Sequence, residues 1–155
     1  MKKLAILSLA LLLALSLVGA ALAETTIGVT VKKYDDTFLT EMRNQMKIKG
    51  DELGITLDIV DGKGDQVTQN NFIEQFLTKG YPAIAVNMQD RSAADVVIEK
   101  AKAENVPLVF YNTEPFAEVL QSYDKVYYVG AKAEESGTMQ GVALAAYWDA
   151  HPEAD

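Results

Sequence analysis

One short stretch in the middle of the chain reads Ala83-Ile84-Ala85-Val86-Asn87-Met88. An apolar run of this length, without polar alternation, is typical of a parallel strand that helices cover on both faces. Similar runs rich in β-branched or aromatic residues occur at 25–31, 55–60, 107–111 and 126–130. Because each interval leaves room for a helix, the sequence predicts an α/β fold with a doubly wound parallel sheet of about five strands flanked by helices.

The intervals between these strands show helical periodicity. Apolar residues recur at spacings of three and four in 36–50, where they are Phe38, Leu39, Met42 and Met46, and again in 67–79. Ser92 is a candidate N-cap for a third helix, and a last helix is predicted over 133–148. The inner face of the third helix should carry Ala94, Val97, Ile98 and Ala101.

The amino terminus has the three-part layout of a secretory signal peptide over residues 1–23. A basic start at Lys2 and Lys3 precedes an apolar run, and Ala21 and Ala23 provide the small residues that a signal peptidase needs. An uncleaved anchor is the alternative, since this stretch could just span a bilayer. No basic cluster follows it, so we expect cleavage, no stable membrane anchor, and release of residues 24–155 into the periplasm as one domain.

Composition excludes several function classes. The 155 residues carry 14 basic and 22 acidic side chains, and a net charge of −8 disfavours nucleic acid as a partner. The absence of cysteine excludes thiolate metal sites and cysteine nucleophiles. His151 is the one histidine, and no glycine-rich dinucleotide or phosphate loop occurs. We therefore predict no enzyme activity, no bound metal and no cofactor in this chain.

Polar and aromatic residues cluster where the predicted strands end. Asp36 and Phe38 follow the first strand, Asn87 ends the third and Asn112 follows the fourth. Ligands of open parallel sheets bind beyond these carboxyl ends. A carboxylate accepts hydrogen bonds from hydroxyls, an amide both donates and accepts, and an aromatic ring covers the C–H face of a pyranose. The set predicts a site for an uncharged sugar.

Each of these residues also has a purely structural interpretation. Asp36 could only cap the following helix, Phe38 could be a core residue, and Asn87 could only form a turn. An enzyme alternative would gather Asp35, Asp36 and Asp61 around magnesium, as in phospho-acceptor domains, but Asn87 stands where the phosphorylated aspartate would be. A glycosidase needs two opposed carboxyl groups, and only Asp36 clearly faces a crevice.

Several blocks resemble the periplasmic D-galactose/D-glucose-binding proteins, a type I periplasmic-binding-protein family. The blocks are 27–38, 83–87, 106–115, 122–130 and 135–141, and they are collinear over most of the chain. The motifs Tyr-Asp-Asp-x-Phe and Ser-Tyr-Asp-Lys-x-Tyr-Tyr-Val-Gly are the specific ones. The resemblance implies a sugar receptor that delivers D-galactose, D-glucose or a methylgalactoside to the membrane subunits of an ABC transporter, and that also signals to a chemoreceptor.

The resemblance also implies roles for individual residues. Asp36 would accept hydrogen bonds from sugar hydroxyls, Phe38 would stack on the sugar, and Asn87 would bond a further hydroxyl. Asn112 and Lys32 would lie beside these three, and Lys32 stands where the family often has an aromatic residue. A receptor for another small solute, such as a pentose, a polyol or an autoinducer sugar, remains the alternative.

Members of that family are longer and have a second lobe that carries further sugar ligands and a calcium loop. We therefore expect residues 24–155 to form an amino-terminal sugar-binding lobe, a fragment whose second lobe is absent, so that calcium is expected only in that second lobe. The family's first lobe receives a late chain segment back into its sheet. Without that segment we expect an unpaired sheet edge, which favours aggregation, and weak binding of sugar.

Overall fold

The computed structural model describes residues 25–154, so the predicted signal peptide lies outside the described residues. Five strands form one parallel sheet in the order β2-β1-β3-β4-β5. Because the strand order reverses direction at β1, the predicted doubly wound sheet is confirmed. The strands are β1 (Thr25–Val31), β2 (Ile55–Asp61), β3 (Ile84–Val86), β4 (Leu108–Tyr111) and β5 (Val126–Val129).

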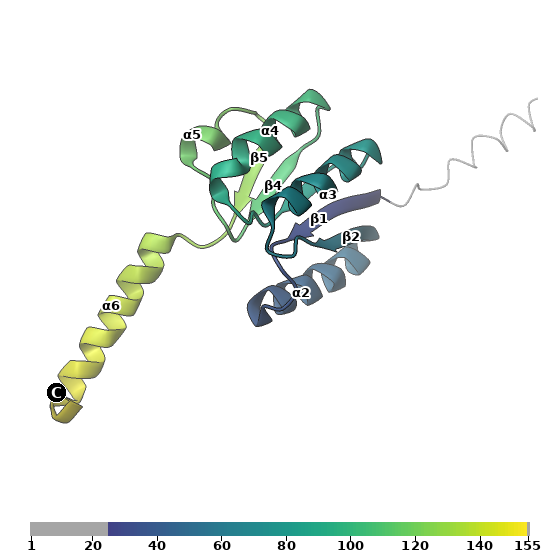
Figure 1. The fold of residues 1–155 in the computed structure, drawn as a ribbon. Coiled ribbons are helices and arrows are strands. Elements are labelled where there is room, and N and C mark those ends of the chain that lie inside the picture. The colour runs from purple at the N-terminus through teal and green to yellow at the C-terminus, as the bar shows by residue number, and fades with distance from the viewer. Residues whose placement is uncertain (1–24, 155) are drawn as a thin grey trace, which may run out of the picture.

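Helices lie on both faces of the sheet, with α3 and α4 on one face and α2 on the other (Figure 1). Successive side chains of β1 and β2 point to opposite faces of the sheet, so each strand can pack against helices on both sides. A β-carbon at Gly28 would overlap the Phe76 ring of α3, whereas Gly50 of α2 lies against Leu57, whose side chain points to the opposite face. The helices are α2 (Thr37–Leu53), α3 (Gln66–Thr78), η1 (Arg91–Ala93), α4 (Ala94–Ala103), α5 (Ala117–Leu120), α6 (Ala133–Ala150) and η2 (Pro152–Ala154).

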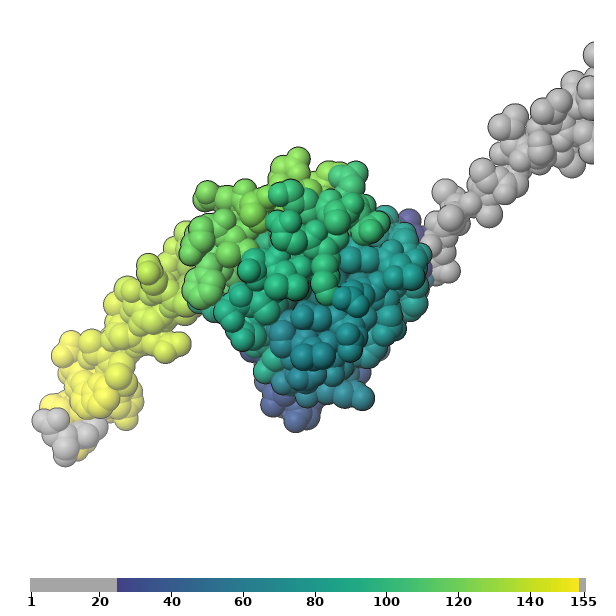
Figure 2. Space-filling view, turned by 45° about the horizontal axis from the view of Figure 1, so that its top comes forward, coloured from purple at the N-terminus to yellow at the C-terminus, as the bar shows by residue number. Residues whose placement is uncertain are grey.

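The last helix does not pack on the sheet. Figures 1 and 2 show α6 extending away from the rest of the molecule, and none of its described side chains is buried. β5 forms an edge of the sheet, and there Tyr127 and Val129 are 56% and 64% exposed. Among the described residues, the β5 edge and an apolar patch on that strand are thus open to solvent. Within residues 25–154, no helix combines the length and hydropathy needed to cross a bilayer.

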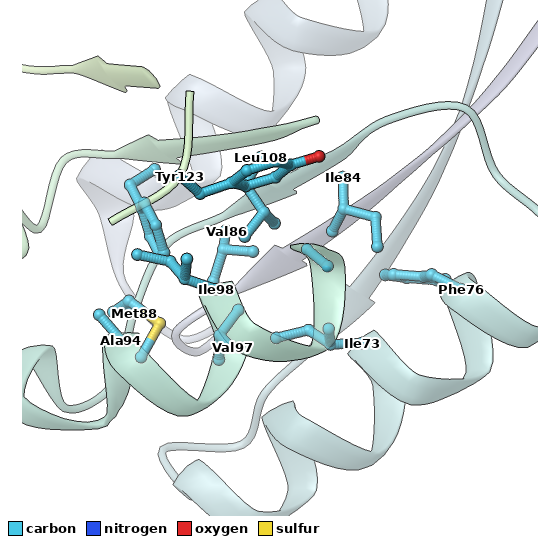
Figure 3. Packing of buried hydrophobic residues seen from close by; sticks show 12 residues of the cluster. Ile73, Phe76, Ile84, Val86, Met88, Ala94, Val97, Ile98, Leu108 and Tyr123 are labelled. Atoms are coloured by element: carbon cyan, nitrogen blue, oxygen red, sulfur yellow. The ribbon is translucent and has the colours of Figure 1, made fainter. Parts of the chain in front are cut away.

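The main core lies between the sheet and the α3–α4 layer (Figure 3). Alternate residues of β3 and β4 point into this layer, so Ile84, Val86, Leu108 and Phe110 are buried in it, whereas Ala85 on the opposite face is half-buried. The predicted inner face of the third helix is confirmed, since all four of its residues are buried. The cluster contains Ile73, Phe76, Ile84, Val86, Met88, Ala94, Val97, Ile98, Ala101, Leu108, Phe110 and Tyr123.

The start of the third helix differs from the prediction. Ser92 is not its N-cap: the Asp90 carboxylate accepts hydrogen bonds from the Ser92 backbone nitrogen, at 2.9 Å, and from its hydroxyl, at 2.7 Å. A carboxylate is a stronger acceptor than a hydroxyl. Asp90 therefore caps the short 3-10 turn η1, which directly follows it. The helix α4 begins only at Ala94, without a side-chain cap.

Candidate ligand-binding site

The carboxyl ends of β1 and β3 are neighbours, and the chain leaves them toward opposite faces of the sheet. The segment after β1 leads to α2, and the segment after β3 leads to α4 on the other face. Divergence of this kind opens a crevice at the switch point of a doubly wound sheet. The predicted ligand residues Asp36, Phe38 and Asn87 all lie on these two segments.

Asp36 caps α2. Its Oδ1 accepts a hydrogen bond from the Leu39 backbone nitrogen at 2.9 Å, and its backbone is extended, as at an N-cap. The capping interpretation is therefore confirmed. The second carboxylate oxygen has no hydrogen-bond partner among the described residues, and the residue is only partly buried. Capping thus leaves one charged acceptor of Asp36 available to a ligand.

Phe38 lies in the first turn of α2, two residues after Asp36, and 62% of its surface is exposed. Its neighbour Leu39 is 3% exposed and takes the inward position. The interpretation of Phe38 as a core residue is therefore wrong. Covering a large apolar ring that is exposed to water is favourable. The Phe38 ring is therefore available to stack on a ligand.

Asn87 is fully buried at the end of β3, and protein groups already engage its amide. Its Nδ2 donates to the Tyr111 carbonyl at 3.2 Å and to the Thr113 hydroxyl at 3.1 Å. Its Oδ1 accepts from the Lys32 backbone nitrogen at 3.4 Å. Asn87 thereby joins the ends of β1, β3 and β4. Because a carbonyl oxygen accepts two bonds, Oδ1 keeps one acceptor position, and direct contact with a sugar stays a prediction.

Lys32 and Asn112 directly follow the carboxyl ends of β1 and β4. Lys32 is partly buried beside Asp90, and its charge adds to the two Ser92 hydrogen bonds that lower the pKa of the Asp90 carboxyl. Asn112 is exposed and has a left-handed backbone, with φ of 62°. Asparagine tolerates this conformation better than most residues. The side chain of Asn112 has no hydrogen bond among the described residues, so it is free to contact a ligand.

Three polar residues are fully buried in the described chain: Thr30, Gln69 and Asn87. Sequence reasoning identified only the last of them. Gln69 Nε2 donates to the Thr30 hydroxyl at 3.1 Å and to the Asn87 carbonyl at 2.8 Å. The Tyr111 hydroxyl donates to the Thr30 carbonyl at 3.0 Å, and burial raises the pKa of this phenol, which keeps it a neutral donor. The sequence did contain a sign of this role: Gln69 precedes Ile73 by four residues and therefore lies on the same inner face of α3.

The acidic residues near the crevice do not form a metal site. Across residues 25–154, no three histidine, aspartate or glutamate side chains lie close enough together to hold a cation. Asp35 pairs with Lys33 at 3.3 Å, and Asp61 accepts from the Lys63 backbone nitrogen at 2.9 Å. The magnesium-dependent alternative with Asp35, Asp36 and Asp61 therefore finds no support in the geometry.

A doubly wound lobe with polar side chains and an exposed aromatic ring at its switch point defines a class, the solute-binding lobes. The chain belongs to the periplasmic binding protein domain family, which matches residues 27–153. This membership agrees with the resemblance found in the sequence motifs, and the type I lobe architecture is confirmed.

Two curated relatives illustrate the family. The D-galactose/methyl-galactoside binding periplasmic protein MglB of Haemophilus influenzae is 42% identical over 161 residues, which cover 100% of this chain and 48% of MglB. The ribose import binding protein RbsB of the same organism is 28% identical over 109 residues, covering 70% of this chain and 37% of RbsB. The chain thus spans about half the length of the curated relatives it matches. Both relatives are binding proteins and not enzymes.

A solved structure supports the fold alone. The crystal structure of a galactofuranose binding protein superposes with a TM-score of 0.73 at 22% identity, covering 80% of this chain and 41% of that one.

Proposed function

We propose that this chain is the sugar-binding amino-terminal lobe of a periplasmic receptor that captures D-galactose, or a closely related hexose, for an ABC importer. The observation that carries the proposal is that Asp36 and Phe38 lie two residues apart at the start of α2, at the switch point. One carboxylate oxygen and one aromatic ring are both unused by the fold. The identity to MglB over the whole chain supports galactose as the preferred sugar.

The chemistry of binding follows from these two side chains. The open oxygen of Asp36 would accept charge-assisted hydrogen bonds from adjacent hydroxyls, which are stronger than neutral ones. Phe38 would cover the apolar face of the pyranose and exclude water from the bonds beside it. Asn87 and Asn112 would offer further polar contacts on the β3 and β4 side of the crevice.

Transport requires a second step, which would be closure of a second lobe over the sugar. A ligand that binds the closed form more tightly shifts the population toward it, and the transporter's membrane subunits would recognise that form. Delivery to the periplasm by the predicted signal peptide, signalling to a chemoreceptor and calcium in a second lobe belong to the same proposal. No residue of this chain is assigned to calcium.

A pentose or polyol receptor is the second candidate. It is favoured by Lys32, which replaces an aromatic residue of the resembled family, and by the identity to the ribose-binding relative. A cationic side chain at the crevice would bond an additional hydroxyl in place of ring stacking, so it would change which sugar fits best.

The test is an NMR titration of the protein with D-galactose, D-glucose and D-ribose, because one wall of a crevice is expected to bind weakly. We expect shifts around Asp36 and Phe38, with D-galactose binding most tightly. The substitution Phe38→Ala should weaken D-galactose binding by about fivefold or more, since an aromatic contact contributes roughly 1 kcal/mol beyond area burial. Tyr127→Ala is the matched control, because Tyr127 is an exposed aromatic residue within β5.

Unchanged affinity in Phe38→Ala would contradict the stacking role. Tighter binding of D-ribose than of either hexose would favour the second candidate.

A further inference from the structure

Two glutamines of α3 hold the segment that leaves β3. Gln69 Oε1 accepts a hydrogen bond from the Gln89 backbone nitrogen at 3.0 Å, and Gln66 Oε1 accepts from the Asp90 backbone nitrogen at 2.8 Å. The two glutamines are three residues apart and therefore neighbours on the helix surface. The consecutive amides of Gln89 and Asp90 thus donate to side chains of one helix rather than to a neighbouring strand.

Gln69 does more than accept one bond. Its Nε2 donates both hydrogens, to the Asn87 carbonyl and to the Thr30 hydroxyl, and the side chain is fully buried. Three of its four hydrogen-bonding positions are therefore occupied. The Asn87 backbone nitrogen in turn donates to the Thr30 carbonyl at 3.0 Å. Gln69 thus joins the end of β1 to the segment after β3 at the switch point.

This arrangement is more specific than core stability requires. An apolar residue at position 69 would fill the inner face of α3 beside Ile73 without any need for partners, whereas a buried amide is tolerated only when it is satisfied. The partners that satisfy Gln69 all lie at the carboxyl ends of β1 and β3, where the two strands part. Buried networks of this kind fix a unique geometry.

We infer that Gln66 and Gln69 are positioning residues that fix the segment 87–90 and, through it, the place of Asn87, which bonds the start of the segment that carries Asp36 and Phe38. The consequence for sugar binding rests on the function proposed above. The fixation of the segment does not, so it can be tested without any ligand.

The first experiment is amide hydrogen exchange by NMR on the ligand-free protein. Gln69→Met keeps the length of the side chain and removes its hydrogen bonds, so the Gln89 amide should exchange about tenfold faster, the factor expected when one hydrogen bond is lost. Gln66→Met should do the same for the Asp90 amide. Gln75→Met is the matched control, since Gln75 is exposed on the same helix.

A stability control separates positioning from general loosening. Ile73→Val removes one methylene from the same buried face of α3 and leaves every polar bond in place. It should speed exchange throughout the core without singling out residues 87–90. If Gln69→Met does not fold, Gln66→Met, at a partly buried position, still decides the question.

The second experiment repeats the D-galactose titration on the same variants. Loss of amide protection at Gln89 or Asp90, together with weaker D-galactose binding than in Ile73→Val, supports the inference. Unchanged protection in both glutamine variants overturns it, and so does lost protection with unchanged affinity. If the unsubstituted protein binds none of the sugars, the proposed function fails, and the exchange data alone decide whether the glutamines fix the segment.

Discussion

Asp36 is expected to have two separable roles, and substitutions can distinguish them. Its Oδ1 caps α2, and no acidic residue lies in the first turn of that helix to replace it. Asp36→Ala should lower the free energy of unfolding by about 1 kcal/mol, the usual cost of losing an N-cap. For a domain of this size that corresponds to a fall in Tm of about 4 °C.

Asp36→Asn should retain most of that stability. Asparagine caps helices about as well as aspartate, and the lost interaction with the helix dipole is worth only about 0.5 kcal/mol. Both substitutions remove the charged acceptor, however, and a hydrogen bond to a charged group contributes roughly 1.5–3 kcal/mol. D-galactose binding should therefore weaken between about tenfold and a hundredfold in both variants.

Asp65 provides the matched control, because it caps α3 as Asp36 caps α2. Its Oδ2 accepts from the Thr68 backbone nitrogen at 2.7 Å. Asp65→Ala should lower the Tm and leave D-galactose affinity unchanged. Thermal unfolding followed by circular dichroism and the NMR titration measure the two effects. The reasoning fails if Asp36→Asn loses as much stability as Asp36→Ala, or if either variant binds D-galactose as tightly as the unsubstituted protein.

Three further predictions concern the fold. Gly28→Ala should cost about 1–3 kcal/mol in chemical denaturation, since the added methyl overlaps the Phe76 ring; wild-type stability would contradict this packing. The Lys79 hydrogen bond lowers the pKa of Asp58, so the stability from this pair is present above about pH 4, the range of an unperturbed aspartate, and is lost as the pH falls. Asp58→Asn should flatten the acid limb of stability against pH, and an unchanged limb would exclude the pair as its cause. Val129→Lys should raise solubility in sedimentation assays by placing a charge on the open β5 edge, and an unaltered sedimentation profile would show that this edge does not drive association.

The strands and helices could be predicted because burial sets their composition. β3 lies between β1 and β4, and its Ile84 and Val86 side chains are buried beneath α3 and α4, while Ala85 on the other face is half-buried. β3 accordingly shows an uninterrupted apolar run in the sequence. Its end was predicted less well, since the run continues to 88 whereas the strand ends at Val86. The reason is that the Asn87 carbonyl accepts from the Gln69 side chain, and the apolar pattern carries no information about that bond.

The site was predicted in part. The residue types Asp36 and Phe38 indicated a polyhydroxyl ligand, but periodicity also assigned Phe38 to the inner face of α2 with Leu39. Adjacent helical residues point about 100° apart, so a helix can bury either one or both of them, and the structure shows that α2 buries Leu39 and leaves Phe38 exposed. Periodicity alone leaves this choice open, because both side chains are apolar.

Gln69 was missed for the opposite reason. A polar residue in an amphipathic pattern is ordinarily assigned to the solvent face, yet Gln69 lies four residues before Ile73 and seven before Phe76, on the buried face. Its place becomes intelligible only when the partners are known, and they lie 39 residues earlier at Thr30 and 18 residues later at Asn87. Such a residue can be recognised in a sequence as a violation of the apolar pattern, but its partners depend on strand order. A polar residue on a buried helical face that borders a predicted switch point should therefore be examined first as a support for the binding residues.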